Sequence, residues 1–241
     1  MIPKIQQSES KDQQIESLKT DVVITAEGLG KRFNREWIFK DLTYEFTSGN
    51  TYAITGGNGA GKSTLLQVLS GFVPPTTGSV NYFPGRILTA VDDIFKNIAV
   101  AAPYMDLIDE FTLTEQVKFH FRLKRSRYNF GTQEIISMMY LEHSKDKYIS
   151  NFSSGMKQRV KLALAFYTDA EIVLLDEPGT NLDSKAFSWY KTELLKLPKN
   201  CLTLIASNNP AEYGEDAILL EIEKYKTGDS PGNSKQRVTT E

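Results

Sequence analysis

The stretch Gly56-Gly57-Asn58-Gly59-Ala60-Gly61-Lys62-Ser63-Thr64 decides the fold of this chain. It fits the pattern G-x-x-x-x-G-K-[S/T], in which glycines let successive backbone N–H groups point inward around an anion. The run 51–55 before it is short, β-branched and aromatic, which is typical of a buried strand. After it, apolar residues recur at helical spacing until Gly71 and Pro74 end the helix. Strand, glycine-rich turn and helix together predict a phosphate-binding loop.

The loop also predicts which groups hold a nucleotide. Its N–H groups lie at the start of a helix, where the partial positive charge favours phosphate. Lys62 would place its ammonium between the β- and γ-phosphates, and the Ser63 hydroxyl would be a ligand of Mg²⁺. The alternative is an ordinary glycine-rich turn, and the flanking strand and helix argue against it.

Composition limits the class of protein. A length of 241 residues is enough for one sizeable α/β core with a smaller subdomain. A net charge of −2 argues against a broad basic surface that would bind nucleic acid. The basic cluster 122–127 is expected to be a solvated helix end, with a membrane-phosphate or partner contact as the alternative. Cys201, the one cysteine, lies in an apolar run and is expected in the core of a protein from a reducing compartment.

The same composition predicts a cytoplasmic location. No apolar stretch reaches membrane-spanning length, and the N-terminus lacks the apolar region of a signal peptide. We therefore expect a soluble protein that reaches a membrane only through a partner.

Apolar periodicity predicts one nucleotide-binding domain over 21–224, between a flexible segment 1–20 and a flexible tail 225–241. A helical subdomain is expected at approximately 105–160, with its aromatic and methionine side chains in the core. No internal repeat is visible, so a single nucleotide-binding unit is expected. Further strands are predicted at 22–24, 42–46, 80–83, 172–175, 202–206 and 218–220.

Two acidic residues close the fully apolar run 172–175, which is typical of a central parallel strand. The carboxyl end of such a strand is where an α/β sheet presents its ligands. Asp176 would hold Mg²⁺ through water, and Glu177 would orient and polarise the attacking water. The alternative is a pair of solvated carboxylates that simply ends the strand.

The segment Asn151–Arg159 precedes an apolar helix, and Ser153 or Ser154 can cap it. Capping alone would explain the segment if the other motifs were missing. With them, residues from about 22 to 223 resemble the ATP-binding subunit of an ABC transporter, whose signature motif, usually written LSGGQ, stands here as Phe152–Met156. The resemblance implies an α/β P-loop core with a mixed, mainly parallel sheet, an antiparallel β subdomain and a helical subdomain.

The resemblance further implies a head-to-tail dimer in which Ser153 and Gly155 contact the γ-phosphate held by the other subunit. It implies that Phe33 stacks on adenine, that 181–183 forms the D-loop at the dimer interface, and that the helical subdomain docks on a transmembrane permease subunit. The cofactors expected are ATP and Mg²⁺. The catalytic residues would be Glu177, Lys62 and Asn208. The nucleotide-binding residues would be Phe33, Gly56–Thr64, Ser153 and Gly155. The metal-binding residues would be Ser63 and Asp176.

Several positions depart from the family pattern. Ser154 and Met156 replace the usual glycine and glutamine, a variant similar to that of some exporter-type subunits. Tyr104 falls at or near the Q-loop glutamine, and Asn208 aligns best with the switch histidine. Asparagine can donate a hydrogen bond to phosphate but cannot carry positive charge. Slow or partner-dependent hydrolysis is therefore expected.

The leading hypothesis is an ATPase that dimerises on Mg-ATP and drives a separate transmembrane subunit, at the cytoplasmic face of the membrane. The dimer would be a homodimer or would include a second ATP-binding subunit. An ATP-gated clamp with weak hydrolysis is the second hypothesis, which the missing histidine and glutamine favour. A P-loop kinase is the third, and it leaves the signature segment unexplained.

Overall fold

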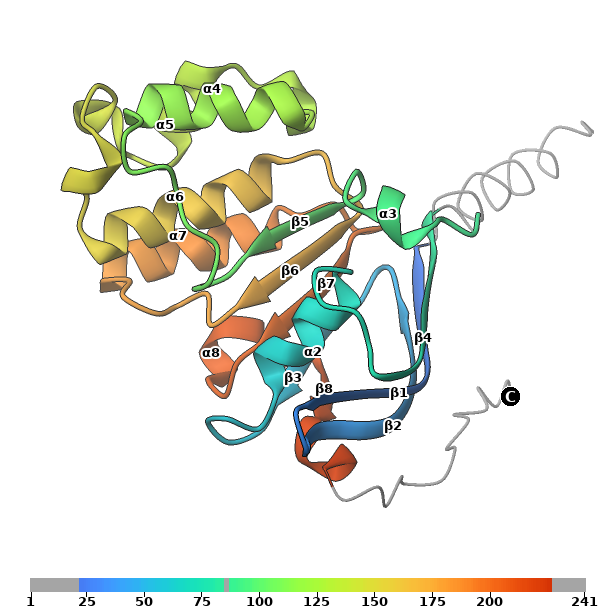
Figure 1. Cartoon of the computed structure of the whole chain (residues 1–241). Helices are drawn as coiled ribbons and strands as arrows, with labels where there is room; N and C mark the ends of the chain where they lie inside the picture. Colours follow the sequence, from blue (N-terminus) through green and yellow to red (C-terminus); the bar gives the residue numbers. More distant parts are fainter. Residues whose placement is uncertain (1–21, 85–86, 227–241) are drawn as a thin grey trace, which may run out of the picture.

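A computed structural model of the chain describes residues 22–84 and 87–226, which form two sheets with helices packed around them (Figure 1). The predicted flexible segment 1–20 and most of the predicted tail lie outside the described residues. The strands are β1 (Val23–Phe33), β2 (Glu36–Thr47), β3 (Thr51–Thr55), β4 (Thr77–Phe83), β5 (Ile98–Ala101), β6 (Ile172–Asp176), β7 (Leu202–Ala206) and β8 (Ile218–Glu221).

The two sheets differ in direction. One has the order β2-β1-β4 with antiparallel pairs, and the other has the order β5-β6-β7-β3-β8 with parallel pairs. The expected α/β core with an additional antiparallel unit is thus confirmed. The helices are α2 (Lys62–Leu69), α3 (Val91–Ile94), α4 (Leu113–Leu123), α5 (Thr132–Met138), α6 (Ser154–Tyr167), α7 (Ser184–Leu195) and α8 (Pro210–Tyr213), and a 3₁₀ turn, η5 (Ile222–Tyr225), follows β8.

Strand β6 lies between two hydrophobic clusters because successive strand side chains point to opposite faces. Ile172 and Leu174 pack with α2 and the antiparallel sheet, whereas Val173 and Leu175 pack with α6 and α7. All five residues of β6 are buried. Both faces of the parallel sheet are therefore covered, which explains why this strand is a continuous apolar run without alternation.

The helical segments α4 and α5 lie over α6 along its length (Figure 1). Leu113, Val117 and Met139 are fully buried there, but Phe119 is 41% exposed and Leu123 is 70% exposed. The expectation that the aromatic and methionine side chains of this segment lie in the core therefore holds for Met139 but not for Phe119. Only one face of α4 meets α5, so the opposite face stays in contact with water.

The basic cluster 122–127 is only partly a solvated helix end. Arg127 is 6% exposed, and its guanidinium donates to the carbonyl oxygens of Phe166 at 3.1 Å and Ala170 at 3.0 Å. Lys124 is half-buried and donates to the carbonyl of Ile98 at 3.1 Å. The carbonyls of Phe166 and Ala170 lie at or just beyond the C-terminal end of α6, where backbone acceptors lack intrahelical partners, and the Arg127 guanidinium supplies donors. The carbonyl of Ile98 belongs to the first residue of β5.

Parallel pairing brings the carboxyl ends of β3, β6, β7 and β8 to one edge of the sheet. The glycine-rich loop follows β3, and the acidic pair Asp176 and Glu177 lies at the end of β6. Asn208 follows β7, and η5 follows β8. Four segments far apart in the sequence therefore meet at this edge.

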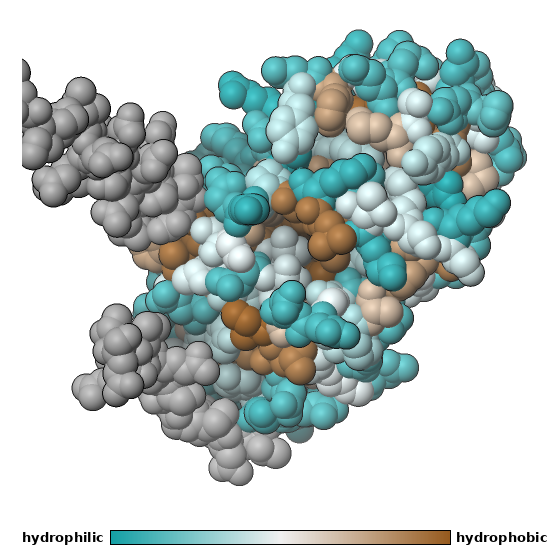
Figure 2. Space-filling view, turned by 180° about the vertical axis from the view of Figure 1, so that it is seen from behind, coloured by the Kyte–Doolittle hydropathy of each residue, from teal (hydrophilic) through white to brown (hydrophobic). Residues whose placement is uncertain are grey.

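Most of the visible surface is polar, with apolar side chains gathered in a few patches on the face in Figure 2. Within 22–84 and 87–226, no helix combines the length and the apolar character that crossing a membrane requires.

Candidate nucleotide-binding site

The glycine-rich loop wraps around the start of α2. Gly61 is the N-cap of this helix and has φ 107°, a left-handed conformation that favours glycine. A Cβ atom at Gly61 would also collide with the side chain of Ile38. Both the backbone angle and the close approach of β2 therefore require glycine at this position.

Lys62 lies inside the loop with 6% of its surface exposed. Its ammonium donates to the carbonyl oxygen of Gly56 at 2.6 Å and to that of Gly57 at 3.2 Å. The cation is therefore held by the backbone of the same loop whose N–H groups are expected to surround phosphate.

Asp176 is the most deeply buried acid of the site, with 1% of its surface exposed. Burial raises the pKa of its carboxyl, and the charge of Glu177 raises it further, while the Ser63 hydroxyl and then the charge of Lys62 lower it. Ser63 is near enough to affect the pKa, yet neither carboxylate oxygen has a hydrogen-bond partner among the described residues. A buried carboxylate without a donor, next to a hydroxyl oxygen, fits Mg²⁺, which prefers oxygen ligands and keeps several waters.

Glu177 is the first residue after β6, and its backbone has φ 45°. Its N–H donates to the carbonyl of Ala206 at 2.9 Å, and its own carbonyl accepts from Thr180 at 3.1 Å. A positive φ is uncommon for glutamate and is found where surrounding contacts enforce it. The two backbone hydrogen bonds enforce it here, while the carboxylate itself remains exposed.

Asn208 contacts the loop directly, because its Oδ1 accepts from the N–H of Gly56 at 3.0 Å. The amide oxygen is therefore occupied, and the NH₂ group is the part of the side chain left to donate to a phosphate. Sequence reasoning assigned Asn208 to the phosphate but did not reveal this contact, since the two residues are 152 positions apart.

Tyr104 belongs to the turn after β5, and its ring stacks on Phe72 with ring centroids 6.2 Å apart. Burial raises the pKa of its phenol, the charge of Asp176 raises it further, and a hydrogen bond with the Gln67 side chain lowers it. Tyr104 is therefore close enough to the buried acid to feel its charge.

The remaining predicted residues lie elsewhere in the chain. Ser153 is the N-cap of α6, where its Oγ accepts from Met156 N–H at 3.2 Å, and Gly155 packs against the carbonyl of Asn181. Figure 1 separates this end of α6 from the loop that precedes α2. Phe33 ends β1 in the antiparallel sheet, 47% exposed, with the Lys31 ammonium 4.9 Å from its ring centroid.

A glycine-rich loop at the start of a helix, next to a buried acid at the end of a parallel strand, defines a P-loop nucleoside triphosphatase. Residues 39–180 match the ABC transporter family. The chain belongs to this family, as an ATP-binding subunit.

Relatives of known sequence agree with this assignment. The chain is 30% identical over 192 residues to the uncharacterized ABC transporter ATP-binding protein YybJ of Bacillus subtilis. This alignment covers 80% of the chain and 86% of YybJ. It is 32% identical over 165 residues to the sulfate/thiosulfate import ATP-binding protein CysA of Thermosynechococcus vestitus, and there the match spans only 49% of CysA.

Solved structures share the fold. A putative ABC transporter ATP-binding protein from Pyrococcus furiosus aligns with a TM-score of 0.70 and 21% identity, over 85% of this chain and 100% of that one. The ATP-binding cassette MJ0796, solved as a dimer bound to ADP and Pi, aligns with a TM-score of 0.70 and 22% identity. The alignment covers 83% of this chain and 95% of MJ0796.

Replacing Asp176 with asparagine tests the buried carboxylate. The Asp176→Asn variant should unfold at a higher temperature than wild type without nucleotide, because an amide avoids the cost of burying an unpaired charge. The same variant should bind Mg-ATP about 10–100-fold more weakly, the usual cost of losing an outer-sphere metal partner. Thermal unfolding with and without Mg-ATP measures both effects. Asp216→Asn, at an exposed acid, is the matched control, and unchanged Mg-ATP binding by Asp176→Asn would contradict the assignment.

Proposed function

We propose that this chain hydrolyses ATP as one half of a head-to-tail dimer at the cytoplasmic face of a membrane, and that closing and opening of the dimer drive a transmembrane permease subunit. One observation carries this proposal: the capped start of α6 and the glycine-rich loop lie apart in one chain (Figure 1). Ser153 and Gly155 can therefore complete a phosphate site only on a second subunit, which is either another copy or a different ATP-binding chain.

The proposal assigns a role to each residue of the nucleotide site. The loop N–H groups that have no protein acceptor bind the phosphates together with Lys62, whereas the N–H of Gly56 is bonded to Asn208. Ser63 and Asp176 hold Mg²⁺, and Phe33 stacks on adenine. Bound Mg²⁺ supplies charge neutralisation for the β- and γ-phosphate oxygens. Glu177, exposed at the end of β6, orients the attacking water and polarises it. ATP favours the closed dimer because it binds both halves only in that state, and product release reopens it.

Hydrolysis in the isolated chain is proposed to be slow. Asn208 offers the γ-phosphate one neutral NH₂ group, since its oxygen is already bonded to Gly56. Tyr104 provides a phenol where the family has a glutamine that helps hold Mg²⁺. Loss of one well-placed donor typically lowers kcat by about 10²–10³-fold. These two residues are also the observations that favour the alternative, an ATP-gated clamp in which hydrolysis is incidental.

The Asn208→His variant tests this assignment. Histidine can donate to the γ-phosphate and can carry charge, so kcat should rise by about tenfold or more while the KM for ATP changes little. Steady-state phosphate release at saturating Mg-ATP measures the rate. Rapid turnover by the isolated wild-type chain would refute the proposal of slow hydrolysis. An unchanged kcat in the variant would remove Asn208 from the catalytic group.

The Glu177→Gln variant tests the shared site. Glutamine keeps the shape of the side chain but cannot polarise water as a base, so ATP should remain bound and the dimer should accumulate. Light scattering after size-exclusion chromatography, with and without saturating Mg-ATP, measures the mass. A variant that binds ATP yet stays monomeric would contradict the head-to-tail mechanism, and Glu215→Gln at an exposed site is the control.

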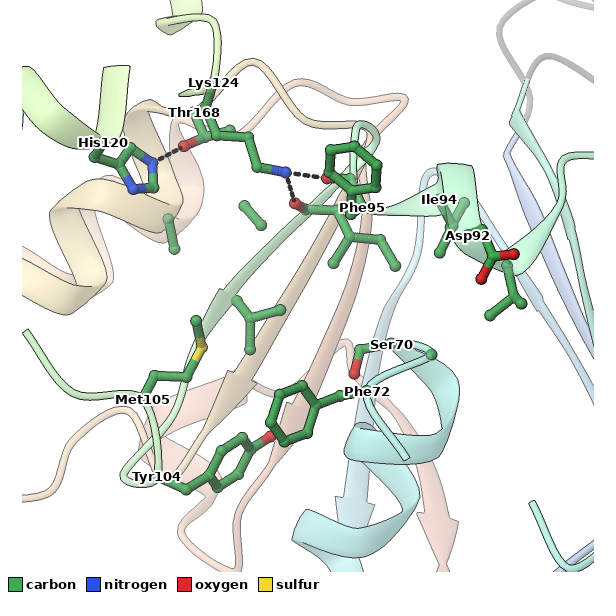
Figure 3. A pocket seen from close by; sticks show the side chains of 16 residues that line it. Ser70, Phe72, Asp92, Ile94, Phe95, Tyr104, Met105, His120, Lys124 and Thr168 are labelled. Atoms are coloured by element: carbon green, nitrogen blue, oxygen red, sulfur yellow. Dashed lines mark hydrogen bonds between the residues drawn. The ribbon is translucent and has the colours of Figure 1, made fainter. Parts of the chain in front are cut away.

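The permease is proposed to dock in a pocket of about 430 Å³ between the nucleotide-binding core and the helical subdomain (Figure 3). Phe72 follows α2, Phe95 follows α3, and Tyr104 and Met105 lie in the turn after β5. All four are at least 36% exposed, so a large apolar surface faces solvent here. Exposed apolar surface that lines a hollow is typical of a protein interaction site.

The basic side chains that line this pocket, Lys124 and His120, are already paired, which favours an apolar occupant. Lys124 donates to the carbonyls of Phe95 and Ile98, and His120 pairs with the Thr168 hydroxyl at 2.8 Å (Figure 3). Burial, together with the charge of Lys124, lowers the pKa of His120 to about 4, so the imidazole is neutral at pH 7. We therefore propose that a short amphipathic helix of the permease inserts its apolar side chains here.

Truncating Phe95 tests the docking site. Phe95→Ala should weaken the complex by about 2 kcal/mol or more, the usual cost of losing a central aromatic contact, and should leave ATP binding unchanged. Affinity purification from mild detergent, with mass spectrometry of the proteins that accompany the chain, measures the association. Leu195→Ala removes a side chain that is 86% exposed outside the pocket and is the control. Ribosomal proteins or DNA in place of a polytopic membrane protein would overturn the transport proposal.

A further inference from the structure

The peptide group between Gly56 and Gly57 is held at both ends by charged side chains. Its N–H, which belongs to Gly57, donates to Oε1 of Glu223 at 2.9 Å. Its C=O, which belongs to Gly56, accepts from the Lys62 ammonium at 2.6 Å. A carboxylate and an ammonium therefore bind the same peptide group from opposite sides.

Glu223 reaches the loop from a firmly packed support. It belongs to η5, in which Ile222 is fully buried and Tyr225 is 8% exposed. A Cβ atom placed on Gly56 would lie 2.8 Å from Cγ2 of Ile222, so η5 and the loop are in close contact. The backbone of Glu223 is thereby fixed next to the loop, although its side chain is exposed.

The geometry of a trans peptide makes these two contacts cooperative. The N–H and C=O bonds point in opposite directions, so a carboxylate at the N–H and an ammonium at the C=O both align with the peptide dipole. Hydrogen bonds to ionised groups are shorter and stronger than those between neutral groups. Rotation of this peptide would break both contacts at once, and Lys62 would lose its nearest carbonyl.

We propose that Glu223 is a positioning residue for ATP binding, and that it acts through the Gly56–Gly57 peptide to hold Lys62 at the phosphate site. The inference rests on the proposed role of Lys62 toward the phosphates. Sequence reasoning gave no signal for it, because Glu223 lies 166 residues from Gly57 and belongs to no motif.

Two substitutions separate the hydrogen bond from the charge. Glu223→Ala removes the acceptor and should raise the Kd and KM for Mg-ATP about tenfold, with a smaller fall in kcat. Glu223→Gln keeps an oxygen acceptor without the charge and should restore most of the affinity, leaving a loss of about threefold. Isothermal titration calorimetry and steady-state kinetics measure these values. Glu221→Gln is the matched control, since this exposed carboxylate two residues away pairs with Lys224.

A second measurement needs no nucleotide and so separates this inference from the proposed function. Amide hydrogen exchange of Gly57, followed by NMR on the nucleotide-free chain, should be faster in Glu223→Ala than in wild type and close to wild type in Glu223→Gln. Failure of the wild-type chain to bind Mg-ATP would overturn the proposed function and, with it, any role of Glu223 in ATP binding. Exchange at Gly57 would still show whether Glu223 holds the loop, so the two failures can be told apart.

Three results would overturn the positioning role itself: unchanged affinity in Glu223→Ala, unchanged exchange at Gly57, or tighter ATP binding by Glu223→Gln. The last would mean that the carboxylate repels the triphosphate and does not support the loop. Should Glu223→Ala fail to fold, Glu223→Gln decides the question through the same two measurements.

Discussion

Parallel strand pairing is the constraint on which the rest of this structure depends. Because β3, β6, β7 and β8 run in one direction, their carboxyl ends meet at one edge of the sheet. Backbone N–H groups, a buried carboxylate and an asparagine amide reach that edge from distant parts of the chain. Apolar layers on both faces of the sheet keep the strands in register. Rigid packing thus positions groups that are themselves polar and partly exposed.

A buried carboxylate, that of Asp176, lies at the centre of the site. Neither carboxylate oxygen of this buried residue has a hydrogen-bond donor within 22–84 and 87–226, an arrangement that costs stability unless a cation completes it. Lys62 donates to the loop carbonyls, and its charge offsets only part of the effect of burial on Asp176, whose pKa stays raised. A divalent cation bound with nucleotide would relieve this cost, and the resulting gain in stability would favour the loaded state.

The proposed docking pocket and the nucleotide site are linked by one residue. Tyr104 lines the pocket, stacks on Phe72, and is close enough to Asp176 for its pKa to respond to that charge. A partner that moves the turn after β5 would therefore move a phenol beside the proposed metal site. This proximity suggests a short route between an occupant of the pocket and a bound nucleotide, which would be tested by measuring ATP binding with the pocket occupied.

The sequence by itself determined the local chemistry of the fold. The loop Gly56–Thr64 predicted the strand before it, the start of the helix after it and a nucleotide-binding protein, and the apolar run that ends in Asp176 predicted a central strand. Each of these signals lies within one short segment of the chain. Only the tertiary structure decided which distant groups meet. The Glu223 and Asn208 contacts to the loop, the burial of Arg127 and the exposure of Phe119 depend on packing between segments far apart in the chain. Local periodicity carries no information on such contacts, because they arise from how whole elements pack together.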